Sequence, residues 1–197
     1  MRKKSIKLAA QTFVTNVEQI IAFTVRGGTA APLTEQDQSW CYDLAIIRLY
    51  REFEDLMLSC LVALINNDTT TFSQLKNRTF PKHMNVEVCE YLICGDGYFD
   101  FAGRDGLLKT IKKIVPNGHW LPTTVGDAAY ANALKKLSAL RNFAAHDSSV
   151  SKKRALEAIG QERISSSGAW LKKQNRFATI CESLKAMAQQ IDATAPY

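Results

Sequence analysis

Residues 127–149 read DAAYANALKKLSALRNFAAHDSS, and this stretch indicates the fold more clearly than any other part of the chain. Its apolar side chains recur at steps of three and four residues and so share one face: Tyr130, Ala133, Leu134, Leu137, Leu140 and Ala144. This period is typical of an amphipathic α-helix that packs against other helices. The helix is expected to begin near Asp127 and to stop at the turn-forming residues Asp147 and Ser148.

The same period recurs along most of the chain, and no segment alternates apolar and polar residues as a strand would. Long helices are expected over about 5–25, 35–65 and 169–191, with short ones over 85–93, 107–114 and 151–159 and a turn of helix at 72–76. Thr34 is a candidate N-cap for the second helix, and Gly27 and Gly28 are expected to end the first. Trp40 and Trp170 lie in register with apolar residues and are expected in the core. The pattern predicts an all-α bundle of four to five main helices.

Residues 66–122 differ in character from the segments on either side of them. The stretch NNDTTTFSQLKNRTFP at 66–81 is polar and turn-rich, and CGDGYFDFAGRDG at 94–106 is rich in glycine. A chain of 197 residues is long enough for one substantial core. We therefore expect a single domain over 1–197, in which 66–122 form an insert of short helices and loops packed on the main bundle.

The composition is that of a globular protein, because 46% of the residues are hydrophobic and 22% are charged. Lys and Arg number 25 and Asp and Glu 19, which gives a net charge of +6. The excess is concentrated in 131–190, where eleven Lys or Arg and four Asp or Glu give a net of +7. A polyanionic partner such as nucleic acid is one reason for this concentration, and a solvated basic surface is the other.

Three sequence features indicate the compartment and whether a metal is bound: the cysteines, the histidines and the length of the apolar runs. Five scattered cysteines argue against a disulfide framework and favour a reducing compartment. No apolar run approaches the roughly 18 residues of a membrane-spanning helix. After the basic start of the chain, polar residues interrupt the apolar stretch that a signal peptide would need. His83, Cys89, Cys94 and His119 match no standard zinc spacing. We expect a cytoplasmic protein with no membrane segment, no metal and no cofactor.

Arg141 occupies an unusual place on its helix. On a helical wheel it falls inside the apolar stripe, between Leu137 and Ala144. A charge that faces a core or an interface must be paired or used. The same wheel places Glu54 among the apolar residues of the 35–65 helix. A structural ion pair between Arg141 and Glu54 is therefore one interpretation, and a functional arginine is the other.

His146 follows Arg141 by five residues, so on a regular helix its side chain points about 140° away. The two side chains can meet only through a widened turn, a helix end between them, or a second subunit. Histidine, with an unperturbed pKa of about 6.5, exchanges a proton near neutral pH, and arginine stays charged and can hold a phosphate. These residue types suit phosphodiester chemistry, although a lone histidine is more often a surface or capping residue.

The segment RNFAAH at 141–146 lies at the end of the penultimate long helix of an all-α chain, and it resembles the motif of the HEPN superfamily. The resemblance covers 35–65 and 127–191 and says little about 66–122. It implies a helical bundle that forms a two-fold dimer, with two copies of the motif in one cleft. Many members are metal-independent endoribonucleases, often in toxin–antitoxin, abortive-infection or other defence systems. Other members lack activity and serve in binding or complex assembly.

The resemblance implies roles for individual residues. Arg141 would position the phosphate and stabilise the transition state, His146 would transfer the proton, and Asn142 would hydrogen-bond the substrate or the motif. From the wheel alone, Glu54 is a candidate for orienting Arg141; Asp147 is a candidate for fixing the tautomer of His146 or for the turn. The expected partners are RNA, a second copy of the chain, and an antitoxin or other defence protein. The alternatives are a non-catalytic module that binds RNA, nucleotide or protein, and a helical scaffold.

Overall fold

The computed structural model describes residues 3–27 and 33–197. This part of the chain contains ten helices and no strand, so the all-α prediction is confirmed. In chain order the helices are α1 (Ile6–Gly27), α2 (Glu35–Asn67), α3 (Thr70–Lys76), α4 (Val86–Cys94), α5 (Gly103–Lys112), α6 (Trp120–Val125), α7 (Ala128–His146), α8 (Ser149–Ile159), α9 (Ser167–Leu171) and α10 (Arg176–Thr194). The helices α1, α2, α7 and α10 form the main bundle. Gly27 ends α1, and Gly28 lies outside the described residues.

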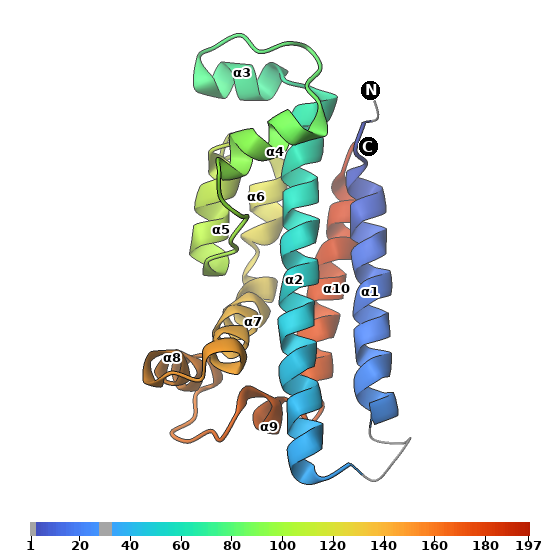
Figure 1. Cartoon of the computed structure of the whole chain (residues 1–197). Coiled ribbons are helices and arrows are strands. Elements are labelled where there is room, and N and C mark those ends of the chain that lie inside the picture. Colours follow the sequence, from blue (N-terminus) through green and yellow to red (C-terminus); the bar gives the residue numbers. More distant parts are fainter. Residues whose placement is uncertain (1–2, 28–32) are drawn as a thin grey trace.

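The 33-residue helix α2 is the centre of the bundle. Figure 1 shows α1 and α10 along one side of it and α4 to α7 along the other. Its N-cap is Thr34, as expected: the Thr34 hydroxyl accepts from the Asp37 amide at 3.2 Å, and the Asp37 carboxylate accepts from the Thr34 amide at 3.1 Å. This capping box satisfies donors that have no partner within the helix. Helices cover α2 on these two sides, whereas Arg48, Arg51 and Asp55 of its central turns are exposed.

Residues 66–122 fold as a set of short helices that pack against α2, α7 and α10. Phe101, Leu107, Ile111 and Leu121 of this segment are fully buried. They belong to the same hydrophobic cluster as the side chains of the long helices. The ring of Phe101 meets the ring of Phe53 in α2 edge-on, with 4.9 Å between the centroids. The insert therefore shares the core that surrounds α2.

The single helix expected over 169–191 is instead two helices. α9 ends at Leu171 and α10 begins at Arg176, and between them Gln174 and Asn175 have φ angles of 54° and 55°. This left-handed backbone stops a right-handed helix, and asparagine adopts it at lower cost than most residues. Periodicity did not predict the break because the apolar residues on its two sides fall in one register.

Two smaller expectations also differ from the structure. Trp40 is 57% exposed and lies outside the core, because Trp40 and Leu44 share an uncovered face of α2. Trp170, by contrast, is buried as expected. The short helix α6 was not predicted, and its third residue is Pro122. Proline is tolerated there because the amides of a first helical turn have no partner within the helix.

The short helix α9 lies against α2 at the distance of backbone contact. A methyl group on Gly168 would lie 1.8 Å from the carbonyl oxygen of Ser39 and 2.9 Å from the amide nitrogen of Asp43. The Gly168 amide donates to Oδ1 of Asp43 at 2.6 Å. The hydroxyl of buried Ser167 donates to the carbonyl oxygen of Leu140 in α7 at 2.7 Å. Through these two contacts, α9 joins α2 to the half of α7 that carries the motif.

Candidate active site

Arg141 lies on the last turns of α7, where this helix faces α2. Its guanidinium carbon lies 4.3 Å from the centroid of the Tyr50 ring, and Nη1 donates to Oδ1 of Asn142 at 2.8 Å. Within the described ranges, no carboxylate forms an ion pair with Arg141, so the pair with Glu54 that the helical wheel allowed is not formed. The guanidinium is held by an aromatic face and by an amide, and its charge is not neutralised by a direct partner.

Glu54 is half-buried on α2, and its Oε1 accepts a hydrogen bond from the Phe101 amide at 3.1 Å. Burial raises the pKa of the Glu54 carboxyl above its ordinary value, while the Phe101 amide and then the charge of Arg141 act in the opposite direction. Glu54 and Arg141 therefore interact through their electrostatic field without a direct bond. Glu54 orients the loop before α5, whereas Tyr50 and Asn142 orient the arginine.

Tyr50 is the supporting residue that the sequence did not identify as part of the site. It is 2% exposed, and its hydroxyl donates to Oδ1 of Asp100 at 3.2 Å. The same Asp100 oxygen accepts from the Ala102 amide at 3.0 Å. Burial, followed by the nearby charges of Glu54 and Asp100, raises the pKa of Tyr50. Tyr50 therefore remains neutral beneath the guanidinium of Arg141. Its hydroxyl connects the ring that Arg141 packs on to Asp100 of the insert.

His146 is exposed and is the last residue of α7. The helix is α-helical throughout 141–146, with neither a widened turn nor an end between Arg141 and His146. At 1.5 Å per residue the two residues are separated by about 7.5 Å along the axis and point in different directions. The structure does not bring these side chains together within one chain. Of the three ways in which they could meet, a second subunit is the one that this helix leaves open.

Asp147 occupies the turn between α7 and α8. Its φ and ψ are 38° and 42°, and its amide donates to the Phe143 carbonyl at 3.0 Å, which closes the helix. Its side chain forms no hydrogen bond to His146 in the described part of the chain. Instead, Asp147 lies near enough to Asp43 of α2 to raise the pKa of that carboxyl, whose pKa is raised mainly by burial. The structure gives Asp147 the turn role and no part in fixing the tautomer of His146.

The raised pKa of Glu54 predicts a pH-dependent stability. A carboxyl whose pKa is higher in the folded chain stabilises the fold below its unfolded pKa, and this contribution is lost as the pH rises through the folded pKa. Glu54→Gln retains an acceptor for the Phe101 amide without the charge. We expect this variant to be more stable than wild type at about pH 7, and the difference to shrink toward about pH 4. Urea unfolding at both pH values measures this, and an equal difference at both would contradict it.

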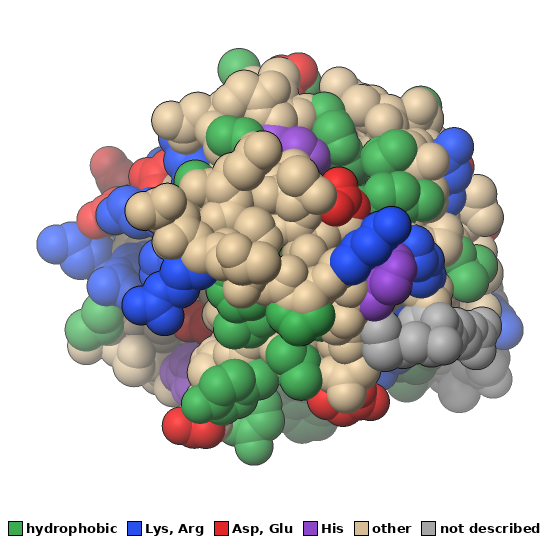
Figure 2. Space-filling model, turned by 90° about the horizontal axis from the view of Figure 1, so that it is seen from above, with side chains coloured by type: hydrophobic (Ala, Val, Ile, Leu, Met, Phe, Trp, Pro, Cys, Tyr) green, Lys and Arg blue, Asp and Glu red, His purple; other side chains and the backbone are tan. Residues whose placement is uncertain are grey.

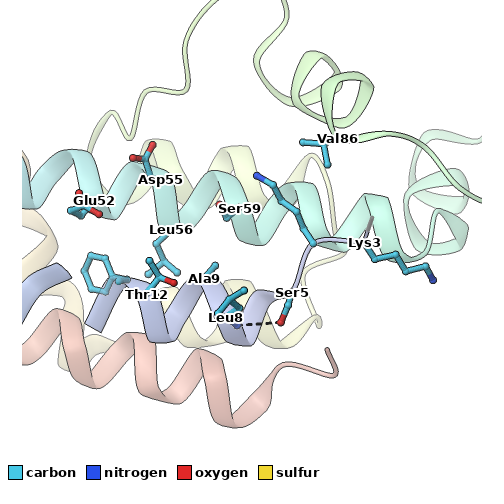
Figure 3. A pocket seen from close by; sticks show the side chains of 12 residues that line it. Lys3, Ser5, Leu8, Ala9, Thr12, Glu52, Asp55, Leu56, Ser59 and Val86 are labelled. Carbon is cyan, nitrogen blue, oxygen red and sulfur yellow. Dashed lines mark hydrogen bonds between the residues drawn. The ribbon is translucent and has the colours of Figure 1, made fainter. Parts of the chain in front are cut away.

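A cavity of about 560 Å³ lies away from these residues, between α1, α2 and the start of α4 (Figure 3). Its lining is mostly apolar and includes Leu8, Leu56 and Val86, with charged side chains such as Lys3 and Asp55. Asp55 of its lining follows Glu54 in the chain, but no residue of the candidate site itself lines the cavity. The cavity therefore adds nothing to the chemistry at the end of α7.

Two further findings concern the described ranges as a whole. No helix in them is long and apolar enough to cross a membrane. No group of three or more His, Cys, Asp or Glu side chains in them is arranged to hold a metal ion. Comparison of the chain with protein-family models, with curated proteins and with solved structures finds no match.

Proposed function

We propose that this chain is a metal-independent endoribonuclease that acts as a two-fold dimer. The observation that carries the proposal is the setting of Arg141, which is held by the Tyr50 ring and the Asn142 amide without a paired carboxylate. An arginine held in this way keeps its charge and its N–H donors for the oxygens of a phosphate. A structural arginine facing the core would be expected to pair with a carboxylate.

In the proposed reaction, RNA supplies its own nucleophile. The 2′-hydroxyl oxygen attacks the adjacent phosphorus, so that an O2′–P bond forms and the P–O5′ bond breaks. One His146 imidazole takes the proton of the 2′-hydroxyl, and the imidazolium of the other subunit gives a proton to the leaving 5′-oxygen. Arg141 holds the non-bridging oxygens as negative charge develops on them, and Asn142 positions Arg141. The products are a 2′,3′-cyclic phosphate and a 5′-hydroxyl.

A dimer accounts for the spacing of the motif. One regular helix holds Arg141 and His146 on different faces, and a two-fold axis can bring the arginine of one subunit toward the histidine of the other. His146 is exposed at the end of α7, and Val150 in the first turn of α8 is 61% exposed. An exposed histidine, followed four residues later by an exposed apolar side chain, is suited to a surface that a second subunit covers.

The test is incubation of the purified protein with single-stranded RNA in excess chelator. We expect cleavage to fragments that end in 2′,3′-cyclic phosphates, identified by mass spectrometry. The same sequence as DNA should remain intact because it lacks the nucleophile. Dependence of cleavage on a metal ion, or fragments with 5′-phosphates, would contradict the mechanism. Binding that weakens steeply with salt, with no RNA cleaved, would favour the non-catalytic module instead.

The biological setting is the part of the proposal that rests on the resemblance alone. We propose that the enzyme is a cytoplasmic toxin or defence effector whose activity is controlled by an antitoxin or another protein of the same system. The concentration of basic residues in 131–190 supports the RNA substrate but does not identify such a partner. An antitoxin or other defence gene beside the gene for this chain would support the setting.

A further inference from the structure

A second cavity, of about 460 Å³, lies between the start of α5 and the middle of α7. Its polar lining residues are Arg104 and Asp105 from α5 and Lys135 and Ser138 from α7. A Cβ on Gly103 would lie 3.9 Å from the hydroxyl oxygen of Ser138, so this hydroxyl faces the start of α5. The cavity is open, with two cationic side chains, one carboxylate and one hydroxyl in its walls.

One wall of the cavity lies on the same side of α7 as the arginine and asparagine of the candidate active site. Ser138 precedes Arg141 by three residues and Asn142 by four, so the three side chains share one side of the helix within about one turn, or 5.4 Å. The opposite wall is fixed to the same site, because Asp100 bonds the Tyr50 hydroxyl and the Phe101 amide bonds Glu54. A strand that places one phosphate on Arg141 can therefore extend over this cavity.

The polar side chains of the cavity differ in the hydrogen bonds and ion pairs that they already make within the chain. Arg104 donates to the Gly126 carbonyl, and its Nη1 lies 4.0 Å from Asp105, whose side chain is 90% exposed. Among the residues that the structure describes, the ammonium of exposed Lys135 has only a long hydrogen bond of 3.5 Å, to the Glu157 carbonyl. The Ser138 hydroxyl has no hydrogen-bond partner within the described ranges. Lys135 and Ser138 can therefore turn to a ligand at small cost, while Arg104 contributes charge from the wall.

The surroundings of the cavity are basic. Lys and Arg side chains, with some Asp and Glu side chains among them, lie at the left edge of Figure 2, the side on which Figure 1 places α5 and α8. These two helices carry exposed cationic side chains: Lys109, Lys112, Lys152, Lys153 and Arg154. A field of this sign attracts a polyanionic strand toward both sides of α7.

We propose that this cavity binds the phosphate of the RNA nucleotide next to the one held by Arg141. The proposal rests on the proposed function and adds a substrate-positioning subsite to it. Lys135 and Ser138 contact the phosphate oxygens, Arg104 adds positive charge, and Asp105 opposes binding. The insert thereby acquires a function, because α5 forms one wall of the subsite.

The test measures binding of a fluorescent single-stranded RNA whose 2′-hydroxyls are all methylated, so that the proposed chemistry cannot cleave it. We expect Lys135→Ala to raise Kd by about tenfold, as for a lost charge-assisted hydrogen bond. The slope of log K against log salt should become less negative by about 0.7, the value for one phosphate contact on a single strand. Ser138→Ala should raise Kd by a smaller factor. Lys7→Ala on α1 removes an exposed lysine distant from the cavity and is the matched control.

Asp105→Asn gives a result of the opposite sign, which a purely structural role of these residues would not produce. Removing this carboxylate should lower Kd by a few fold at low salt, because it repels the phosphate. Unchanged binding in Lys135→Ala, or an equal loss in Lys7→Ala, would overturn the subsite. The proposed function fails in a different way, through the absence of RNA cleavage by the wild-type protein, so the two failures are distinguishable.

Discussion

Arg141→Ala is expected to lower kcat/KM for RNA cleavage by at least about a hundredfold, the cost of losing one donor that stabilises transition-state charge. The fold should survive this substitution, because no ion pair of Arg141 within 3–27 and 33–197 would leave an orphaned carboxylate. The loss of the contact with Tyr50 should cost about 1–2 kcal/mol. Cleavage rates and urea unfolding of the same preparation separate the two effects.

The scaffold alternative makes a different prediction for the same variant. If Arg141 served only to neutralise a buried carboxylate, its removal would destabilise the protein by about 3–5 kcal/mol and no RNA would be cleaved by the wild type. Arg78→Ala is the control for a lost arginine, because Arg78 is exposed in the α3–α4 connection, away from the site. Full activity in Arg141→Ala would show that the site has been assigned wrongly.

Mixing wild-type and inactive subunits tests whether the site is shared between subunits. His146→Ala should also lose cleavage, because the proton-transfer group is removed. When equal amounts of wild-type and His146→Ala subunits are exchanged at random, half of the dimers are mixed, and each mixed dimer holds one histidine where the proposed reaction needs two. Activity should therefore fall to about a quarter of that of the same amount of wild-type dimer. About half of the wild-type activity after proven subunit exchange would mean that each chain works alone.

Gly168→Ala is expected to destabilise the protein by about 3 kcal/mol or more, the upper end of the cost of overpacking. The added methyl would meet the backbone of Ser39 and Asp43, which cannot turn aside as a side chain can. α9 would have to move away from α2, with loss of the bond between the Gly168 amide and Asp43. For a chain of this size the Tm should fall by roughly 6–12 °C. Thermal and urea unfolding measure this effect.

Gly118→Ala is the matched control for this substitution. A Cβ on Gly118 meets no atom within 4 Å, so the same change in composition should alter stability by no more than about 0.5 kcal/mol. Equal stabilities of the two variants would mean that α9 does not lie against α2 as closely as the structure has it. A loss confined to Gly168→Ala would establish this contact as a requirement of the fold.

The helices could be predicted from the sequence because their signals are local. Apolar periodicity located the long helices, and Thr34 marked the start of α2. The break before α10 was missed because Gln174 and Asn175 adopt a left-handed backbone that no periodicity encodes. Trp40 was placed in the core because a wheel shows which residues share a face, but not whether another element covers that face.

The candidate site likewise has parts that the sequence predicts and parts that depend on how the helices pack. The positions of Arg141, Asn142 and His146 on one helix follow from their spacing, and so does the divergence of the arginine from the histidine. The contact of Arg141 with Tyr50 depends on how α7 crosses α2, which no single segment specifies. The wheel allowed Glu54 as one possible partner because the two charges are opposite, whereas Oε1 of Glu54 accepts a hydrogen bond from the Phe101 amide.

The bond between Asp100 and Tyr50 also bears on how this protein can evolve. Loops inserted into a helical bundle commonly gain and lose residues without effect on the rest of the molecule. Here the loop before α5 bonds the residue on which Arg141 lies, so a change in loop length would displace the arginine as well. A change in the length of this loop would therefore have to be accompanied by a compensating change at Tyr50 or Arg141, so the loop and the motif are expected to coevolve.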